Sequence, residues 1–175
     1  MKVFVGYAST QGQSRKIARW ITDGLVAKGH GVELLSLDDS DDLALDRFDR
    51  AVIVGSIHAG HYKPSLVRFM TDHQRWLDHH PVLFASVSLA AAGHDAEDWR
   101  ALDRIIEDLR EVTGWETGQV AQIAGAYKPS EYDIFTRFIM RRIEAEKDPD
   151  ADLNADREYT EWTALEALVT DWMAT

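Results

Sequence analysis

Residues 3–14 read Val-Phe-Val-Gly-Tyr-Ala-Ser-Thr-Gln-Gly-Gln-Ser, and this stretch decides the fold. Its first five residues favour a strand and are apolar on both faces, which is typical of a strand buried in a parallel sheet. A polar loop with one glycine follows at residues 9–13. From Ser14 to Lys28 apolar residues recur at helical spacing, and Gly29 ends the pattern. The stretch and its continuation predict a buried strand, a tight loop and an amphipathic helix.

The same alternation continues along the chain. Residues 32–37 predict a second strand, so residues 3–37 form a strand-helix-strand unit with parallel strands and a right-handed crossover. Further strands are predicted at 50–55, 82–87 and 120–125, and further helices at 64–77, 96–112 and 160–173, the last with Thr160 as its N-cap. The pattern predicts one α/β domain over residues 1–175, a three-layer sandwich around a five-stranded parallel sheet.

Composition narrows the class of protein. A chain of 175 residues, 45% of them hydrophobic, is long enough to bury a core and too apolar for disorder. The net charge of -11 argues against nucleic-acid binding, which needs basic residues to neutralise phosphates. The lack of cysteine excludes disulfides, thiolate metal sites and cysteine nucleophiles. Because the N-terminus turns polar by Ser9 and no run approaches the ~20 apolar residues of a membrane span, we expect a cytoplasmic protein.

Three loops follow predicted strands at the carboxyl edge of the sheet, where open α/β sheets bind ligands. The first loop combines hydroxyl groups, a glycine and the free amides of a helix N-terminus, which together cradle a phosphate. It has no lysine and matches neither the triphosphate nor the dinucleotide pattern, although hydroxyls before a helix are also ordinary caps. A monophosphate is the better match, and flavin mononucleotide (FMN) is the common cofactor that fits. The predicted phosphate-binding residues are Ser9, Thr10, Gln11, Gly12, Gln13 and Ser14.

The second and third loops are suited to a planar ring. Residues 55–62 combine two glycines with apolar and aromatic side chains, and residues 88–93 are mostly small, so both allow a flat group to approach the backbone. The residues expected around the ring are Ser56, Ile57, His58, Ala59, Gly60, His61, Tyr62, Ser88, Leu89, Ala90, Ala91 and Gly93. For the two histidines a local backbone hydrogen bond is the alternative to a role in proton transfer. No matching ligands stand near them, so no metal site is expected.

These motifs resemble a known family. The first loop is similar to the flavodoxin phosphate loop, usually Ser/Thr-x-Thr-Gly-x-Thr, from which Gln11 and Gln13 depart. The closer resemblance is to the flavodoxin-like, quinone-dependent protoporphyrinogen oxidases of haem biosynthesis, and it covers nearly the whole chain. It rests on Tyr-Ala-Ser-Thr-Gln-Gly-Gln-Ser at 7–14, Gly-Ser-Ile-His-Ala-Gly-His-Tyr at 55–62, Phe-Ala-Ser-Val-Ser-Leu at 84–89, Ala-Gly-Ala-Tyr at 124–127 and Tyr-Thr-Glu-Trp at 159–162.

The resemblance implies a flavodoxin-like fold and an FMN-dependent oxidoreductase. Such an enzyme takes hydrogen from protoporphyrinogen IX and passes the electrons to a membrane quinone. That family carries basic residues around its third loop, and this chain has neither lysine nor arginine at residues 88–94. The alternative, favoured by the acidic charge, is a flavodoxin-type electron carrier without a substrate of its own. No pattern identifies a catalytic acid or base, and none predicts an oligomeric state.

Residues 126–157 form an inserted segment after or within the fifth strand. Within it, residues 134–143 place five apolar side chains on one helical stripe beside arginines. Such a helix lies on a membrane surface, closes over an apolar ligand or packs on its own core. The resemblance favours the first two, because a quinone and a porphyrinogen need an apolar surface and propionates need cations. The residues expected to contact substrate, or the inner face of the cell membrane in a peripheral association, are Arg137, Phe138, Arg141 and Arg142.

Overall fold

The strands of the main sheet all run parallel, in the order β2-β1-β3-β4-β5. The computed structural model describes residues 1–129, 134–150 and 152–175. The strands are β1 (Lys2–Ala8), β2 (Gly31–Ser36), β3 (Arg50–Ser56), β4 (Val82–Ser88) and β5 (Gln119–Ala124). In the register of the sheet, Val5 lies between Leu34 and Val52. The predicted five-stranded parallel sheet is confirmed, and each strand begins and ends within one residue of its predicted bounds.

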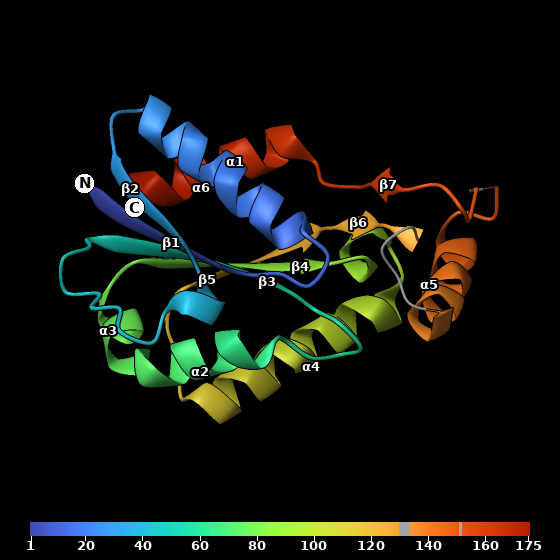
Figure 1. The fold of residues 1–175 in the computed structure, drawn as a ribbon, viewed down its shortest axis with the longest axis horizontal. Helices are drawn as coiled ribbons and strands as arrows, with labels where there is room; N and C mark the ends of the chain where they lie inside the picture. The colour runs from blue at the N-terminus through green and yellow to red at the C-terminus, as the bar shows by residue number, and fades with distance from the viewer. Residues whose placement is uncertain (130–133, 151) are drawn as a thin grey trace.

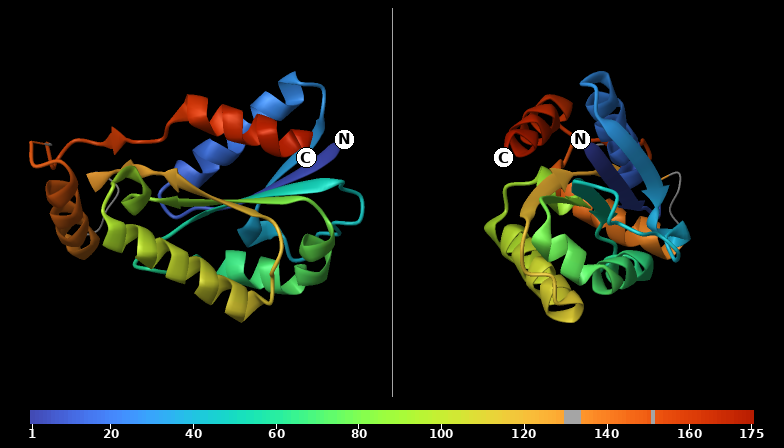
Figure 2. Two further views of the ribbon diagram at one scale, coloured as in Figure 1. Left: turned by 180° about the vertical axis from the view of Figure 1, so that it is seen from behind. Right: turned by 90° about the vertical axis from the view of Figure 1, so that its left-hand side faces the viewer.

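Helices cover both faces of this sheet, as Figures 1 and 2 show. On one face lie α1 (Gln13–Ala27) and α6 (Trp162–Ala174). On the other lie α2 (Pro64–Asp72), α3 (Gln74–His79) and α4 (Ala96–Thr113). Two 3₁₀ turns, η1 (Leu37–Asp39) and η2 (Ala90–Ala92), follow β2 and β4. The three-layer α/β sandwich is therefore confirmed.

The two cores lie on opposite faces of the sheet because side chains alternate along each strand. In β1, Val3 and Val5 pack with α1 and α6, whereas Phe4 packs with α2, α3 and α4. All seven residues of β4 are buried. Burying a large apolar side chain stabilises the fold by roughly 1.5–3 kcal/mol. Burial on both faces explains why the central strands are apolar at nearly every position.

The predicted helix at residues 64–77 is wrong as a single helix. It divides into α2 and α3 at His73, whose backbone (φ -107°, ψ 11°) leaves the helical range. The His73 ring lies 4.6 Å from the ring of Phe69, and Leu77 of α3 is still fully buried. The break therefore turns the chain so that α3 stays in contact with the core.

Thr160 is not the N-cap that the sequence predicts for the last helix. That position belongs to Glu161, and α6 begins at Trp162. The Thr160 hydroxyl instead donates to the backbone oxygen of Ala124 at 2.7 Å and accepts from Nε2 of Gln13 at 2.9 Å. The side chain that the sequence predicts as a cap thus joins the end of β5 to the start of α1.

The segment predicted as an insertion follows β5. Two short strands, β6 (Ala126–Tyr127) and β7 (Arg157–Glu158), form an antiparallel ribbon. Between them lies α5 (Ile134–Lys147). Figure 1 shows α5 beyond the edge of the sheet at which the strands end. The insertion therefore lies beside the loops that the sequence selects for ligand binding.

Two glycines allow a matched test of packing. Gly118, just before β5, has φ +110°, and a Cβ there would lie 2.8 Å from Cζ2 of Trp115 and 3.1 Å from the backbone oxygen of Val82. We expect Gly118→Ala to lower the free energy of unfolding by about 2 kcal/mol or more, because strain and overpacking add. Gly24→Ala, in open space on α1, should raise it by about 0.5–1 kcal/mol. Urea denaturation measures both, and equal effects would contradict this account.

Candidate functional site

The three predicted ligand loops start at neighbouring points of one sheet edge. Ala8 of β1 pairs with Gly55 of β3, and Ser56 pairs with Val87 of β4. The helices that follow β1 and β3 leave toward opposite faces of the sheet. The gap between these two strands is therefore the topological switch point, where this architecture places its ligands.

The first loop has the geometry of an anion-binding turn. Gly12 has φ +88°, and its N–H donates to the Ser9 hydroxyl oxygen at 2.9 Å. Helix α1 starts at the next residue, and no side chain of the described residues caps its N-terminus. The first N–H groups of a helix have no partner within the helix and carry its positive dipole end. These amides are available to a negatively charged group.

One buried hydroxyl supports the fit of a phosphate to this loop. Ser14, in the first turn of α1, is fully buried, and its hydroxyl has no hydrogen-bond partner among the described residues. A buried polar group without a partner costs about 1–3 kcal/mol. A phosphate oxygen would accept a hydrogen bond from this hydroxyl and remove the cost. The donors present are neutral hydroxyl and amide groups, which suits a single phosphate.

The side chain of Gln13 has a different role from the one predicted. Its Nε2 donates to Glu158 of β7 at 3.0 Å and to Thr160 at 2.9 Å. Glu158 also accepts from Nζ of Lys16 at 2.6 Å and from Nε1 of Trp162 at 3.0 Å. Burial raises the pKa of Glu158, but these hydrogen bonds outweigh burial and hold the pKa below its usual value. The Gln13 side chain thus ties β7 to the loop and leaves only its backbone N–H for an anion.

The second loop is a tight turn at its tip. His58 and His61 exchange backbone hydrogen bonds of 2.8 and 3.1 Å. Between them Ala59 (φ +49°) and Gly60 (φ +81°) both take left-handed conformations, as in the two-residue turns of β-hairpins. All four residues are exposed. The main chains of the two histidines therefore close the turn, and these hydrogen bonds leave the role of the two imidazole rings a prediction.

Tyr62 does not offer a flat surface at the end of this loop. Its ring is buried and lies edge-on to Phe84, with 5.3 Å between centroids. Its hydroxyl is 2.7 Å from the hydroxyl oxygen of Ser86 on β4. Burial raises the pKa of Tyr62 far above its usual value, so the phenol stays neutral. Tyr62 therefore holds the second loop against β4.

The third loop is held by its own short contacts. The Ser88 hydroxyl oxygen accepts from the N–H of Ala91 at 3.1 Å, which closes the turn at η2. Nε1 of Trp99, on α4, donates to the backbone oxygen of Gly93 at 2.9 Å. Leu89 points inward and is buried. The small residues Ala90 and Ala91 are only partly buried, so this loop leaves its backbone accessible at the switch point.

The inserted helix packs on this third loop. Met140 and Ile143 of α5 contact the buried cluster of Leu89 and Tyr127, together with Tyr159. Ile143 belongs to the apolar stripe that the sequence predicts, and its side chain packs inward. The structure does not describe the side chains of the other stripe residues. None of the helices in residues 1–129, 134–150 and 152–175 is both long and apolar enough to cross a bilayer.

The four residues predicted to contact substrate or membrane lie on α5. Arg141 and Arg142 are exposed, and Nε of Arg142 lies 3.6 Å from Oε1 of Glu146 on the next turn. Arg137 and Phe138 belong to the same helix, and their side chains lie outside the described part of the structure. The structure thus leaves the two described arginines accessible at the carboxyl edge.

Three further residues of this edge escaped the sequence analysis. Nζ of Lys128 donates to the backbone oxygen of Gln11 at 3.1 Å, inside the first loop. Glu144 of α5 is fully buried and accepts a hydrogen bond from the Tyr159 hydroxyl. Burial first, and then this hydrogen bond, raises the pKa of Tyr159. Tyr159 belongs to a motif that carries the family resemblance, but no role was predicted for it, and no motif marks Lys128 or Glu144. Each becomes relevant only through the path of the inserted segment.

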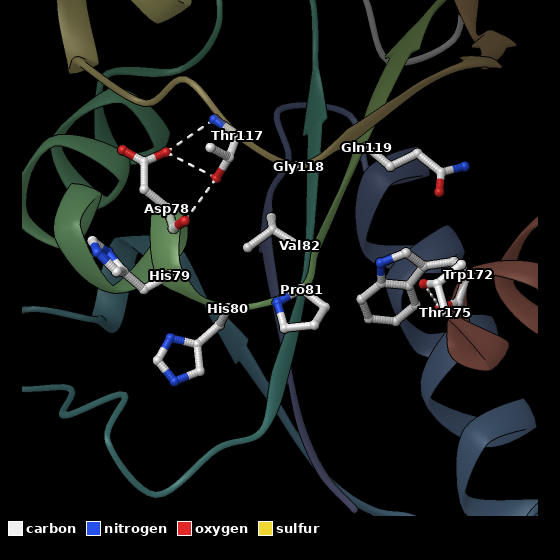
Figure 3. A pocket seen from close by; sticks show the side chains of 10 residues that line it. All are labelled: Asp78, His79, His80, Pro81, Val82, Thr117, Gly118, Gln119, Trp172 and Thr175. Carbon is white, nitrogen blue, oxygen red and sulfur yellow. Dashed lines mark hydrogen bonds between the residues drawn. The ribbon is translucent and has the colours of Figure 1, made fainter.

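A pocket at the opposite edge of the sheet is separate from these loops. It has a volume of about 430 Å³ and lies where β4 and β5 begin, with Trp172 of α6 on one side (Figure 3). Asp78 accepts from the N–H groups of Glu116 and Thr117 at 2.9 Å each. Burial raises the pKa of Asp78, but these hydrogen bonds lower it by more. The carboxylate is therefore committed to the loop before β5, and the pocket holds none of the predicted site residues.

Fold and site geometry together define a flavodoxin-like α/β protein in which a tight turn and an uncapped helix N-terminus follow the first strand. The model of the flavodoxin domain family matches residues 4–154, and the chain belongs to that family. A protein of Escherichia coli strain K12 named protoporphyrinogen IX dehydrogenase [quinone] is 26% identical over 162 residues, covering 93% of this chain and 89% of its own. A Leishmania major protein of the same name is 22% identical, covering 99% and 75%.

Solved structures agree on the fold. The flavodoxin of Streptococcus pneumonia TIGR4 superposes with a TM-score of 0.53 at 16% identity, covering 83% of this chain and 99% of its own. A short-chain flavodoxin associated with a PDU bacterial microcompartment gives 0.54 at 15% identity, covering 71% and 82%. The flavodoxin-like fold that the sequence predicts is confirmed, and the fold is one that fits a flavin.

The Tyr62–Ser86 pair makes the second loop testable. Ser86→Ala leaves the Tyr62 hydroxyl buried without a partner, and Tyr62→Phe does the same to Ser86. We expect each change to lower the free energy of unfolding by about 1–2 kcal/mol. The double variant should lose less than the sum, because it removes both polar groups together. Urea denaturation of the four proteins measures the coupling, and strict additivity would show that the hydrogen bond contributes nothing.

Glu158 predicts a dependence of stability on pH. Because its pKa is lowered in the folded state, its contribution is present above the unfolded value near 4.5 and is lost as the pH falls through the folded value. At pH 7 we expect Glu158→Gln to be less stable than the wild type by about 1 kcal/mol, with the difference vanishing in acid. Urea denaturation from pH 7 to pH 3 measures it. Glu166→Gln, at an exposed position of α6, is the control, and an equal acid dependence of both variants would contradict this role.

Proposed function

We propose that this protein is an FMN-dependent oxidoreductase that oxidises protoporphyrinogen IX with a membrane quinone as electron acceptor. The observation that carries the proposal is the packing of the inserted helix α5 on Leu89, in the loop that the sequence selects for the flavin ring. The named relatives match over 93% and 99% of the chain, so their similarity extends through this insertion. The proposal places the protein in haem biosynthesis.

Two sets of residues would hold the cofactor. The first loop, residues 9–14, would bind the phosphate through backbone N–H groups and the hydroxyls of Ser9, Thr10 and Ser14. The second and third loops, residues 56–62 and 88–93, would line the isoalloxazine with accessible backbone. The buried Ser14 hydroxyl and the uncapped start of α1 support this assignment. A loop of neutral donors suits the single phosphate of FMN.

The bound flavin supplies the redox chemistry, and the protein supplies binding, orientation and electrostatics. Each pair of electrons and protons that leaves the porphyrinogen reduces one quinone to one quinol, so the reaction is balanced without another reductant. Met140 and Ile143 offer apolar contact beside the third loop. Arg141 and Arg142 offer cations to the propionates, a role that the third loop cannot fill because it has no basic residue.

The same helix supports a peripheral association with the inner face of the cell membrane. A quinone dissolved in the bilayer has to reach the site from the lipid, and exposed arginines favour an anionic surface in an otherwise acidic protein. The proposal therefore gives α5 two tasks, contact with the propionates and approach to the membrane.

A flavodoxin-type electron carrier is the second candidate. It is favoured by the net charge of -11, because a negative surface steers association with basic redox partners. It requires no substrate contact and no inserted helix on the third loop. The two candidates share the flavin site and differ in whether the protein turns over a porphyrinogen.

Anaerobic turnover separates the two candidates. The protein reconstituted with FMN should form porphyrin, followed by its fluorescence, when protoporphyrinogen IX and a quinone are both added. Replacing Arg141 and Arg142 together by Gln should raise KM for the porphyrinogen by about three- to tenfold, the effect of weakening partly exposed ion pairs, and leave FMN affinity unchanged. Arg104→Gln, exposed on α4, is the control. Flavin binding without porphyrin formation above the flavin-free protein would favour the carrier.

A further inference from the structure

One exposed indole ring lies beside the third loop. Trp99, in the first turns of α4, is 37% exposed, and no other tryptophan, tyrosine or phenylalanine side chain that the structure describes is exposed. Its Nε1 donates to the backbone oxygen of Gly93, at the end of this loop, at 2.9 Å. This hydrogen bond uses the single polar group of the indole. The surface of Trp99 that meets solvent is therefore apolar ring.

The ring is fixed before any ligand binds. The Asp95 side chain caps α4 by accepting from the N–H groups of Glu97 and Asp98 at 2.8 and 3.1 Å. The N–H of Trp99 donates to the backbone oxygen of Asp95 at 3.1 Å. The helix start thus holds the backbone of Trp99, and Gly93 holds its side chain. An apolar surface that is already ordered loses little entropy when a ligand covers it, so this position suits binding.

Trp99 and α5 border the third loop at its two ends. Helix α5 packs on the cluster that contains Leu89, near the beginning of the loop. Trp99 contacts Gly93 at its end. Figure 1 shows that α4 starts at the same edge of the sheet beyond which α5 lies. The proposed function places this loop against the isoalloxazine, so two separate surfaces are available beside one flavin ring.

The two surfaces differ in charge. Helix α5 offers the exposed Arg141 and Arg142. Residues 88–99, which form the third loop and lead to Trp99, contain neither lysine nor arginine, and Glu97 is exposed there. This part of the chain brings no cation of its own to a carboxylate. A ligand that stacks on Trp99 is therefore expected to be uncharged.

The chemistry of the two substrates matches this difference. Protoporphyrinogen IX carries propionates, and the saturated bridges between its pyrroles keep it from being flat. A quinone ring is uncharged, flat and electron-poor, because its carbonyl groups withdraw electron density. The face of an indole is electron-rich, and offset stacking places such a face against an electron-poor ring. The quinone therefore fits Trp99 better than the porphyrinogen does.

We propose that Trp99 binds the ring of the quinone acceptor by stacking at the end of the third loop, while α5 contacts the porphyrinogen at its beginning. This role rests on the proposed function and adds the residue that recognises its second substrate. Trp99 acts through binding alone, because its one polar group is already held by Gly93.

Equilibrium dialysis of the oxidised, FMN-bound protein against a short-chain benzoquinone measures binding without turnover. We expect Trp99→Leu to raise the Kd for the quinone by about three- to tenfold, the usual contribution of a stacked ring. Trp76→Leu is the matched control, because Trp76 is partly buried on α3 and stacks on His80, which lines the pocket at the opposite edge of the sheet. It should change the Kd by less than about twofold.

Turnover with each substrate varied in turn separates the two rings. In Trp99→Leu the KM for the quinone should rise by about three- to tenfold, and the KM for the porphyrinogen should change by less than about twofold. Arg100→Gln, at the exposed residue next to Trp99, should leave both KM values unchanged. A rise in the porphyrinogen KM in Trp99→Leu or Arg100→Gln would assign this surface to the propionates and overturn the proposal.

The outcomes also separate this role from the proposed function. If Trp99→Leu binds the quinone as the wild type does, Trp99 is not the quinone contact. If Trp99→Leu does not fold, Trp99→Phe decides, because saturable quenching of tryptophan emission by the quinone should disappear with the indole, and quenching that persists overturns the assignment. If quinone binding depends on Trp99 but no porphyrin forms, the proposed oxidation fails and the quinone contact stands. If porphyrin forms and quinone binding is independent of Trp99, only this contact fails.

Discussion

The burial of parallel strands on both faces is the constraint on which the rest of this structure depends. A parallel strand returns to the sheet only through a crossover, so each helix lies on one face and each strand ends at the same edge. The register that sets Ala8 beside Gly55 and Ser56 beside Val87 brings loops of unrelated sequence together. The burial of the apolar strands therefore determines where the site lies. The loops at the strand ends determine which chemical groups the site contains.

Much of this could be predicted from sequence because the signals are local. Strand bounds follow from apolar runs, and the tight turn before α1 follows from a glycine between polar residues and a helix start. The side-chain roles that the sequence predicts differently depend on contacts between residues far apart in sequence. Thr160 has the side chain of an N-cap, but it is used between Ala124 and Gln13. Tyr62 has the ring of a stacking residue, but burial against Ser86 takes it out of the site.

The inserted segment was predicted as a helix with a basic and an apolar side, and its contacts could not be predicted. Amphipathicity shows that a helix has an apolar side and does not show what covers it. Here Met140 and Ile143 pack against Leu89, so part of that side is used to hold the helix on the third loop. The β6–β7 ribbon, at only two residues a strand, has no periodic signal at all. The sequence alone therefore does not predict which residues this ribbon positions.

The hydrogen bonds from Gln13 to Glu158 and Thr160 join positions 145 and 147 residues apart. A growing chain exposes the phosphate loop among its first residues but completes the contacts of that loop only when residue 160 has been made. Closing so long a loop costs entropy that rises only slowly with its length, so the late contact is not prohibitive. The five-stranded sheet has all its strands once residue 124 has been made, but the loop at residues 9–14 then still lacks its contacts with residues 158 and 160. The loop at residues 9–14 is therefore completed only after the sheet that positions it.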